Sequence, residues 1–188
     1  MAKIDYTMIA KQIFKREGRA VTRLAETIDT ESFNSVVTAI LECKNRGGRV
    51  IVTGRGNSGA AAHKISYSLC CVDVPSVFLM PGDGYHASSG LIRTGDLLIA
   101  VSRGGDSGDV IELMKMARHK NAKVIAVTAN PASTMALICD IMLRVPIERD
   151  VDIHDYLDTA TMMAMIAVFD AVALAIQPGG KTGESEKE

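Results

Sequence analysis

The chain has 188 residues, a formal net charge of −1 and 47% hydrophobic residues. This length suffices for one domain with a full core, and the hydrophobic content excludes an intrinsically disordered polymer. The balanced charge gives no indication of nucleic-acid binding. The first 18 residues are charged throughout, unlike a signal peptide, and no apolar run approaches the roughly 20 residues that span a bilayer. We therefore expect a cytoplasmic protein with no nucleic-acid or membrane partner.

The elements predicted first along the chain are helices. Apolar residues recur at helical spacing over 5–17 and 31–46, and the segment 19–28 suits a further helix. Short apolar runs rich in β-branched residues then follow, at 48–54, 75–80, 96–102, 123–129 and 141–146. These runs are continuous rather than alternating, as in strands that are buried on both faces of a parallel sheet.

Helical patterns separate most of these runs, at 58–72, 107–121 and 131–138, and a final apolar helix covers 156–176. The alternation predicts a doubly wound α/β fold, a three-layer sandwich in which helices flank a five-stranded parallel sheet in the flavodoxin-like manner. We expect one domain over 1–178, with N-terminal helices over 5–46 and a sheet core over 48–146. The polar segment 179–188 reads as a disordered tail.

Ligands of such folds bind at the carboxyl ends of the strands, near the point where the strand order reverses. The loop after the first predicted strand reads "TGRGNSGAAAHK", with Gly54, Gly56 and Gly59 permitting close backbone approach and Ser58 at the start of a helix. The G-x-G-x-x-G spacing also occurs in NAD-binding proteins, which need an acid about 20 residues later. Asp73 lies near that distance but precedes the second strand, so NAD binding is weakly indicated.

The third predicted strand ends in "AVSRGGDSGDV". Ser102 closes the strand, Gly104 and Gly105 turn the chain, and Asp106 or Ser107 is expected to cap the next helix. Serine hydroxyls beside the unpaired N–H groups of a helix N-terminus can hold a phosphate without a lysine.

A third strand end, "TANPAS", adds Thr128, Asn130 as an expected cap and Ser133. Because the carboxyl ends of parallel strands meet at one edge of a sheet, these polar loops predict a single site there. Its donors suit a small, phosphorylated, hydroxyl-rich ligand.

Several motifs in order carry a resemblance to a known family. "GRGNSG", "PGDGYH", "GLIRTGDLLIAVSRGGDS", "VIAVTANPAST" and "VPIERD" resemble the sugar isomerase (SIS) domain family, most closely its arabinose-5-phosphate isomerase branch. The resemblance covers residues 30–176. It implies phosphosugar binding by a homodimer or homotetramer and an aldose–ketose isomerisation that needs no cofactor or metal. The CBS domains that often follow the SIS domain in these isomerases are absent from this sequence.

By position, the resemblance makes Glu148 the candidate base and His86 its catalytic partner, with Asp106 as a third catalytic candidate and His154 in reserve. The same carry-over gives the phosphosugar ligands as Gly56, Asn57, Ser58, Ser102, Arg103, Gly104, Gly105, Ser107 and Thr161.

This sequence departs from the pattern of the isomerases at several of these positions. Asn57 replaces a lysine, Asp106 replaces a glutamate, and Arg103-Gly104 replaces an Asn/Gly-Ser pair. These changes do not argue against phosphosugar binding. They leave two types of reaction, on an arabinose 5-phosphate or on a 6-phospho-3-hexulose.

Two alternatives remain open at this point. A zinc-dependent phosphosugar isomerase would need clustered ligands, but the four histidines at 63, 86, 119 and 154 lack the paired spacing of a local zinc site. A non-catalytic phosphosugar sensor is the other class, since SIS domains also serve in regulators. The four cysteines, at 43, 70, 71 and 139, form no CxxC pair and read as reduced residues of a cytosolic protein.

Overall fold

The protein, described here from a computed structural model, is built on one five-stranded parallel sheet. The structure describes residues 5–86, 88–146 and 157–177. The strand order is β2-β1-β3-β4-β5, and every neighbouring pair is parallel. The strands are β1 (Val50–Gly54), β2 (Ser76–Phe78), β3 (Leu97–Val101), β4 (Lys123–Thr128) and β5 (Ile141–Arg144). The expected sheet is therefore confirmed, with its strand order reversing between β1 and β3.

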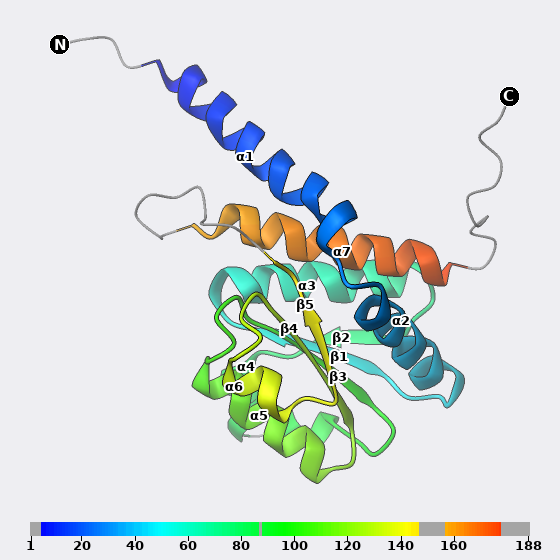
Figure 1. Cartoon of the computed structure of the whole chain (residues 1–188). Helices are drawn as coiled ribbons and strands as arrows, with labels where there is room; N and C mark the ends of the chain where they lie inside the picture. Colours follow the sequence, from blue (N-terminus) through cyan, green and yellow to red (C-terminus); the bar gives the residue numbers. More distant parts are fainter. Residues whose placement is uncertain (1–4, 87, 147–156, 178–188) are drawn as a thin grey trace, which may run out of the picture.

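Helices cover both faces of the sheet, which confirms the three-layer sandwich (Figure 1). One layer contains α1 (Tyr6–Thr27), α2 (Thr30–Asn45), α3 (Gly56–Cys71) and α7 (Thr159–Ile176). The other contains α4 (Pro81–His86), the 3-10 turn η1 (Ser88–Leu91), α5 (Gly108–His119) and α6 (Thr134–Ile138).

The central strands explain the continuous apolar runs of the sequence. Every residue of β1 and of β3 is buried. Because successive side chains of a strand point to opposite faces, alternate residues enter two different cores. Val50 and Val52 pack in the cluster formed with α2, α3 and α7, whereas Ile51 packs in the cluster formed with α5. A strand placed between two helical layers therefore needs an apolar side chain at nearly every position.

Helix α7 is apolar enough to resemble a membrane-spanning segment by length and composition, with a mean hydropathy of 2.0 over 18 residues. Half of it is buried inside the described structure, and it lies beside α1 and α3. Its buried residues, such as Met165, Phe169 and Val172, join the core cluster over β1 and β3. These contacts are those of a core helix, so its apolar character has a structural cause in the domain itself.

The N-terminal helix differs from the sequence-based prediction. Residues 6–27 form one continuous helix, α1, where helical patterns over 5–17 and 19–28 indicated two. Gly18 lies between the two patterns, and nothing approaches the position of a side chain there. Glycine lowers helix stability by only about 1 kcal/mol, which is too little to force a break.

The segment 81–86, for which the sequence patterns indicated neither a helix nor a strand, forms the short helix α4. Pro81 begins this helix, a position that proline favours because the missing N–H has no helical partner there. Helix α6 begins later than predicted, at Thr134. Its N-cap is Ser133, whose Oγ accepts the N–H of Ala136 at 3.4 Å, rather than Asn130. The predicted tail 179–188 lies outside the described residues.

Candidate functional site

The loop between β1 and α3 turns sharply and brings a helix N-terminus to the carboxyl edge of the sheet. A Cβ on Gly54 would lie 2.7 Å from the carbonyl oxygen of Ser58, and one on Gly59 would lie 2.7 Å from the carbonyl oxygen of Gly54. Only glycine permits this close crossing of strand and helix. Arg55 is the N-cap of α3 and makes no side-chain cap bond, so the first-turn N–H groups at Gly56, Asn57 and Ser58 have no side-chain cap from that residue.

The loop between β3 and α5 places two hydroxyl groups together. Ser102 is only 6% exposed, and its Oγ accepts the N–H of Gly105 at 3.2 Å. The Oγ atoms of Ser102 and Ser107 lie 3.2 Å apart. Ser107 is the N-cap of α5 by position, but its side chain does not cap the helix as expected. Its hydroxyl faces the other serine instead, beside a helix N-terminus that Ser107 leaves without a side-chain cap.

These two loops are neighbours in space because β1 and β3 are adjacent strands. Gly54 at the end of β1 is paired with Val101 at the end of β3. An ion pair of 3.7 Å between Arg55 and Asp109 then links the two loops. The loops meet where the strand order reverses, which is the position at which doubly wound sheets bind ligands.

The expected third loop, after β4, lies against the loop after β3. Thr128 is fully buried, and its Oγ1 donates to the carbonyl oxygen of Arg103 at 2.9 Å. Asn130 forms a local turn through its Oδ1, which accepts the N–H of Ala132 at 3.0 Å. The three loops therefore form one continuous edge, as the sequence predicts.

Arg103 connects this edge to the start of α7. Its guanidinium forms an ion pair with Asp158, the N-cap of α7, and both side chains are about one-third exposed. Sequence analysis did not identify Asp158, although an acid directly before a long apolar helix is a recognisable N-cap signal. Thr161, one of the expected ligands, lies in the first turn of α7 and is 2% exposed. It is therefore far less accessible than the half-buried Ser107.

Asp106 has a different environment from that of a typical proton-transfer group. Its Oδ1 accepts the backbone N–H of Thr134 at 2.9 Å. Hydrogen bonds from the backbone and side chain of Thr134 lower the pKa of Asp106 below its ordinary value, because they stabilise the ionised form. The carboxylate is thus engaged with the loop after β4 and does not cap α5.

The remaining catalytic candidates cannot be placed in full. Glu148 and His154 lie outside the described residues. His86 is the last residue of α4, and its side chain also lies outside the described part. Of the other two histidines, His63 is exposed on α3 and makes an edge-to-face contact with Phe78, with ring centroids 5.4 Å apart. Within the described ranges, no group of three or more potential metal ligands occurs.

The position of Asp73 in the fold contradicts the weak indication of NAD binding. Asp73 lies in the turn between α3 and β2, with a positive φ of 58°. This turn precedes β2 and therefore lies at the amino edge of the sheet, whereas the glycine-rich loop lies at the carboxyl edge. Asp73 therefore lies at the opposite edge of the sheet from that loop and cannot bind a ribose held there.

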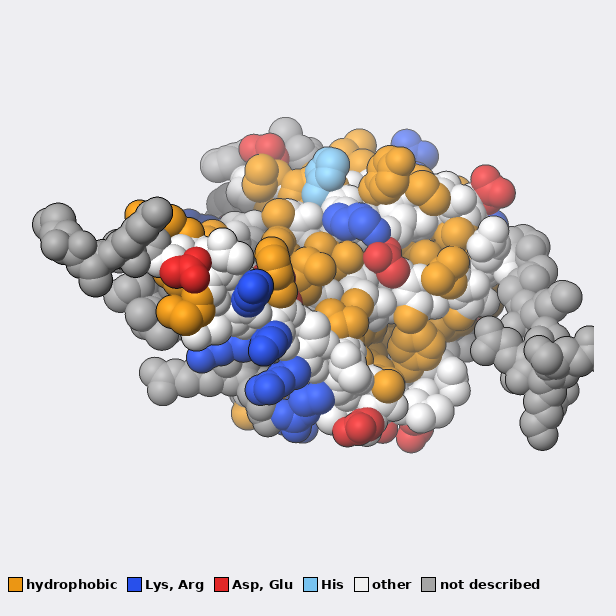
Figure 2. Space-filling model, turned by 90° about the horizontal axis from the view of Figure 1, so that it is seen from above, with side chains coloured by type: hydrophobic (Ala, Val, Ile, Leu, Met, Phe, Trp, Pro, Cys, Tyr) orange, Lys and Arg blue, Asp and Glu red, His pale blue; other side chains and the backbone are white. Residues whose placement is uncertain are grey.

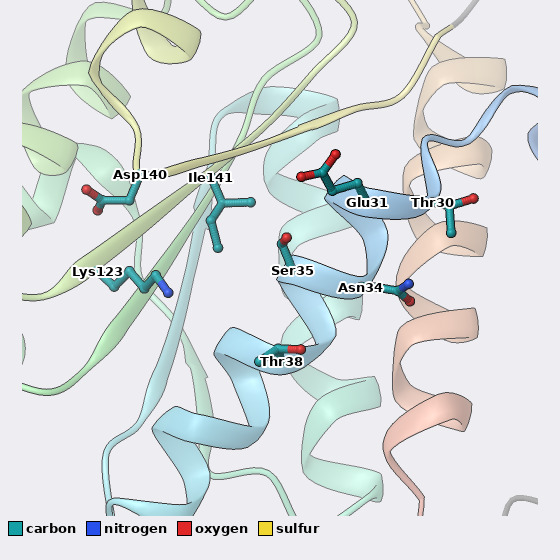
Figure 3. A pocket seen from close by; sticks show the side chains of 8 residues that line it. All are labelled: Thr30, Glu31, Asn34, Ser35, Thr38, Lys123, Asp140 and Ile141. Carbon is teal, nitrogen blue, oxygen red and sulfur yellow. The ribbon is translucent and has the colours of Figure 1, made fainter.

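A cavity of about 730 Å³ lies at the same amino edge, between α2 and the starts of β4 and β5 (Figure 3). Asp140 in its lining is already engaged, because its carboxylate accepts the N–H of Val124 at 2.7 Å and a guanidinium N–H of Arg118 at 2.8 Å. The lining residues are Thr30, Glu31, Asn34, Ser35, Thr38, Lys123, Asp140 and Ile141. The cavity is separate from the strand-end loops and contains none of the expected site residues.

Comparisons with known proteins identify the family to which this chain is similar. The SIS domain family matches residues 31–175. The chain is 30% identical over 167 residues to the arabinose 5-phosphate isomerase KdsD of Francisella tularensis, covering 89% of this chain and 51% of that protein. It therefore spans about half the length of the curated relatives it matches.

Solved structures show the same fold. A proposed sugar-phosphate isomerase of Listeria monocytogenes is 36% identical and superposes with a TM-score of 0.86 over 93% of this chain and 91% of that chain. A protein of Escherichia coli CFT073, solved in complex with a ligand, is 23% identical and also has a TM-score of 0.86, over 94% and 92% of the two chains. The family match, the switch-point loops and the fold lead to one conclusion: the chain belongs to the SIS domain family.

Proposed function

We propose that this protein binds a phosphosugar at the carboxyl edge of its sheet and isomerises it between aldose and ketose without a metal. The observation that carries the proposal is the pair of hydroxyls from Ser102 and Ser107, 3.2 Å apart at the start of α5. Hydroxyl donors and helix N–H groups that converge on one point suit the oxygens of a phosphate. The kinship with arabinose 5-phosphate isomerases supports this substrate class.

The ligand set of the proposal joins three parts of the edge. The phosphate lies on the hydroxyl pair and on the first turns of α3 and α5, with Asn57 and Ser58 on its other side. Arg103 lies in the loop between Ser102 and Ser107 and carries the positive charge of the set. Its guanidinium is shared with Asp158, so it can neutralise the phosphate only in part. Thr161 is buried, and in this proposal it therefore lies behind the residues that contact the phosphate.

The isomerisation moves one proton between adjacent carbons and one between adjacent oxygens. In the proposal, Glu148 removes the C2 proton of the aldose and returns it to C1 of the enediol. His86 moves the hydroxyl proton from O2 to O1, so that the carbonyl group passes from C1 to C2. The aldose and the ketose contain the same atoms and electrons, and therefore no redox cofactor takes part. Positioned acids and bases contribute about 10²–10⁴-fold in rate to such steps.

The substrate proposed first is D-arabinose 5-phosphate, and a 6-phospho-3-hexulose type of substrate is the second choice. A thermal-shift panel of phosphorylated pentoses, hexoses and hexuloses identifies the sugar that stabilises the protein most. NMR spectroscopy of that sugar with the protein then follows its conversion, with and without a chelator. Conversion that persists with the chelator supports the metal-free reaction. Conversion that stops with it would assign the reaction to the zinc-dependent class instead.

A non-catalytic sensor is the second candidate, and Asn57 favours it, because the family pattern that this sequence resembles has a lysine at this position. Its signature is a phosphosugar that binds and stabilises the protein but is not converted by it. Asn57→Lys separates the two functions further. If turnover rises in this variant, the site is an isomerase site that lacks the positively charged side chain. If the variant shows no turnover, the sensor is supported.

The proposed assembly is a homodimer or homotetramer. Figure 2 shows hydrophobic side chains spread over the face formed by α1, α3 and α7. On α1, Tyr6 is 74% exposed and Phe14 is 68% exposed, and on α7 Leu174 is 64% exposed. Such a face needs cover, and a second copy of the chain provides an identical apolar surface.

Light scattering of the purified protein tests this assembly. Phe14→Lys combined with Leu174→Lys is expected to reduce the mass to that of one chain. Leu137→Lys, a change of an even more exposed residue on α6, is the control and should leave the mass unchanged. A parent protein that is monomeric at micromolar concentration would contradict the proposal.

We also place the protein in the cytoplasm, where its four cysteine thiols, none of which forms a disulfide, stay reduced.

A further inference from the structure

The loop after β3 is held by the loop after β4 through a series of hydrogen bonds. The carbonyl oxygen of Arg103 accepts the N–H of Ala129 at 3.1 Å and the hydroxyl of Thr128 at 2.9 Å. The carbonyl oxygen of Gly104 accepts a weaker bond from the side-chain amide of Asn130, at 3.4 Å. The first half of the loop is therefore fixed to the end of β4.

The second half of the loop is fixed to the start of α6. The carbonyl oxygen of Gly105 accepts the N–H of Met135 at 3.0 Å. Gly105 has a φ of +75°, and a Cβ on it would lie 2.1 Å from the Oγ of Ser133, so the backbone of the loop lies directly against that residue. Asp106 completes the series, because its Oδ1 accepts the N–H of Thr134 at 2.9 Å. Every residue from 103 to 106 is thus attached to the segment 128–135.

The attachment determines where the two site hydroxyls lie. Ser102 precedes the attached residues and Ser107 follows them directly, so the distance between the two hydroxyls depends on the path of the four residues between them. Asp106 is the last attached residue and is adjacent to Ser107. Its carboxylate is exposed, and the bonds from Thr134 lower its pKa, which makes it a weak proton acceptor near neutral pH.

We propose that Asp106 is a positioning residue: its carboxylate oxygen anchors the loop after β3 on the start of α6 and thereby holds the hydroxyls of Ser102 and Ser107 at the spacing that a phosphate requires. This inference rests on the proposed phosphosugar site. It differs from the role expected for Asp106 from the resemblance, which was catalytic. An anchor needs a hydrogen-bond acceptor but not a negative charge, whereas a base needs its ionisable carboxylate. The two roles therefore predict opposite results for an amide at this position.

The first experiment compares Asp106→Asn with Asp106→Ala. We expect Asp106→Asn to stay within about twofold of the parent protein in Kd for D-arabinose 5-phosphate and in kcat/KM, since its amide oxygen also accepts the N–H of Thr134. We expect Asp106→Ala to weaken binding about 10- to 100-fold, the effect of a displaced ligand-binding group. Glu112→Ala, a change of an exposed acid on α5 that pairs with Lys115, is the control for loss of charge.

Two results would overturn the inference. The first is an Asp106→Asn variant that binds the sugar phosphate normally but has lost turnover, because this pattern assigns proton transfer to the carboxylate. The second is an Asp106→Ala variant that binds as the parent does. The pH profile adds a further readout: the profile of Asp106→Asn should keep the shape of the parent profile if Asp106 transfers no proton.

A second experiment tests the anchor without any ligand. Amide hydrogen exchange at Thr134 should be slow in the parent and in Asp106→Asn and much faster in Asp106→Ala. If the parent binds no phosphosugar, the proposed function fails, but this exchange pattern still decides whether the anchor exists. Thr128→Val removes one of the two hydrogen bonds that hold the carbonyl of Arg103 at the other end of the loop, and Thr128→Ser restores the hydroxyl. Weaker binding in the first and recovery in the second are expected, and equal binding in both would count against the attachment.

Discussion

Replacing Ser102 and Ser107 together by alanine should weaken phosphosugar binding severely while leaving the protein folded. A hydrogen bond to a charged group contributes about 1.5–3 kcal/mol, so two of them amount to about 3–6 kcal/mol. Since about 1.4 kcal/mol corresponds to a factor of ten, Kd should rise about 10²–10⁴-fold. The fold is expected to survive, because the double variant loses only the bond from the N–H of Gly105 to Ser102 and the bond between the two hydroxyls, each of 3.2 Å, and Ser107 makes no capping bond.

The assay is isothermal titration with D-arabinose 5-phosphate, together with thermal unfolding of each variant. Ser102→Ala alone should lower the free energy of unfolding by about 1 kcal/mol for each of its two lost bonds, to Gly105 and to Ser107, and Ser107→Ala should lower it less, because this variant loses only the bond to Ser102. Ser35→Ala, in the remote cavity, is the control. A double variant that binds as tightly as the parent would refute the hydroxyl pair as the phosphate site.

Four further predictions concern catalysis, the start of α7 and stability. Glu148→Gln should abolish turnover and retain binding, because the amide keeps the size of the side chain but cannot accept the carbon proton; normal turnover by NMR would exclude Glu148 as the base. His86→Asn should also slow turnover, and a substrate in the open-chain form should partly rescue this variant but not Glu148→Gln. Asp158→Asn removes one negatively charged partner of Arg103 and so strengthens the attraction of its guanidinium for the ligand; Kd measured by titration should therefore fall, and a rise would show that the pair is needed to position Arg103. Asp96→Ala should lower the free energy of unfolding, by about 1–3 kcal/mol for each buried donor left unsatisfied, because its 4% exposed carboxylate accepts two backbone N–H groups; an unchanged denaturation midpoint would contradict this.

Much of the candidate site could be predicted from the sequence, because its loops follow strands. The apolar runs predict the strands, parallel strands end at one edge, and Ser102 and Ser107 lie directly after such a run. The roles of individual side chains were less predictable. Both Asp106 and Ser107 have the residue type of a helix cap, but one binds the start of α6 and the other faces Ser102. A propensity describes what a side chain can bind locally and says nothing about a competing partner from another loop.

The sequence by itself determined the order of the elements, the parallel sheet and the edge on which the polar loops lie. Hydrophobic periodicity and turn residues act over a few neighbouring positions, and they are therefore readable along the chain. Only the tertiary structure decided which distant residues meet: Arg103 with Asp158 across 55 positions, and Asp106 with Thr134 across 28. It also decided that the patterns around Gly18 merge into one helix. These outcomes depend on how the packed layers bring the chain back on itself, and the path of that return is not encoded in any local pattern.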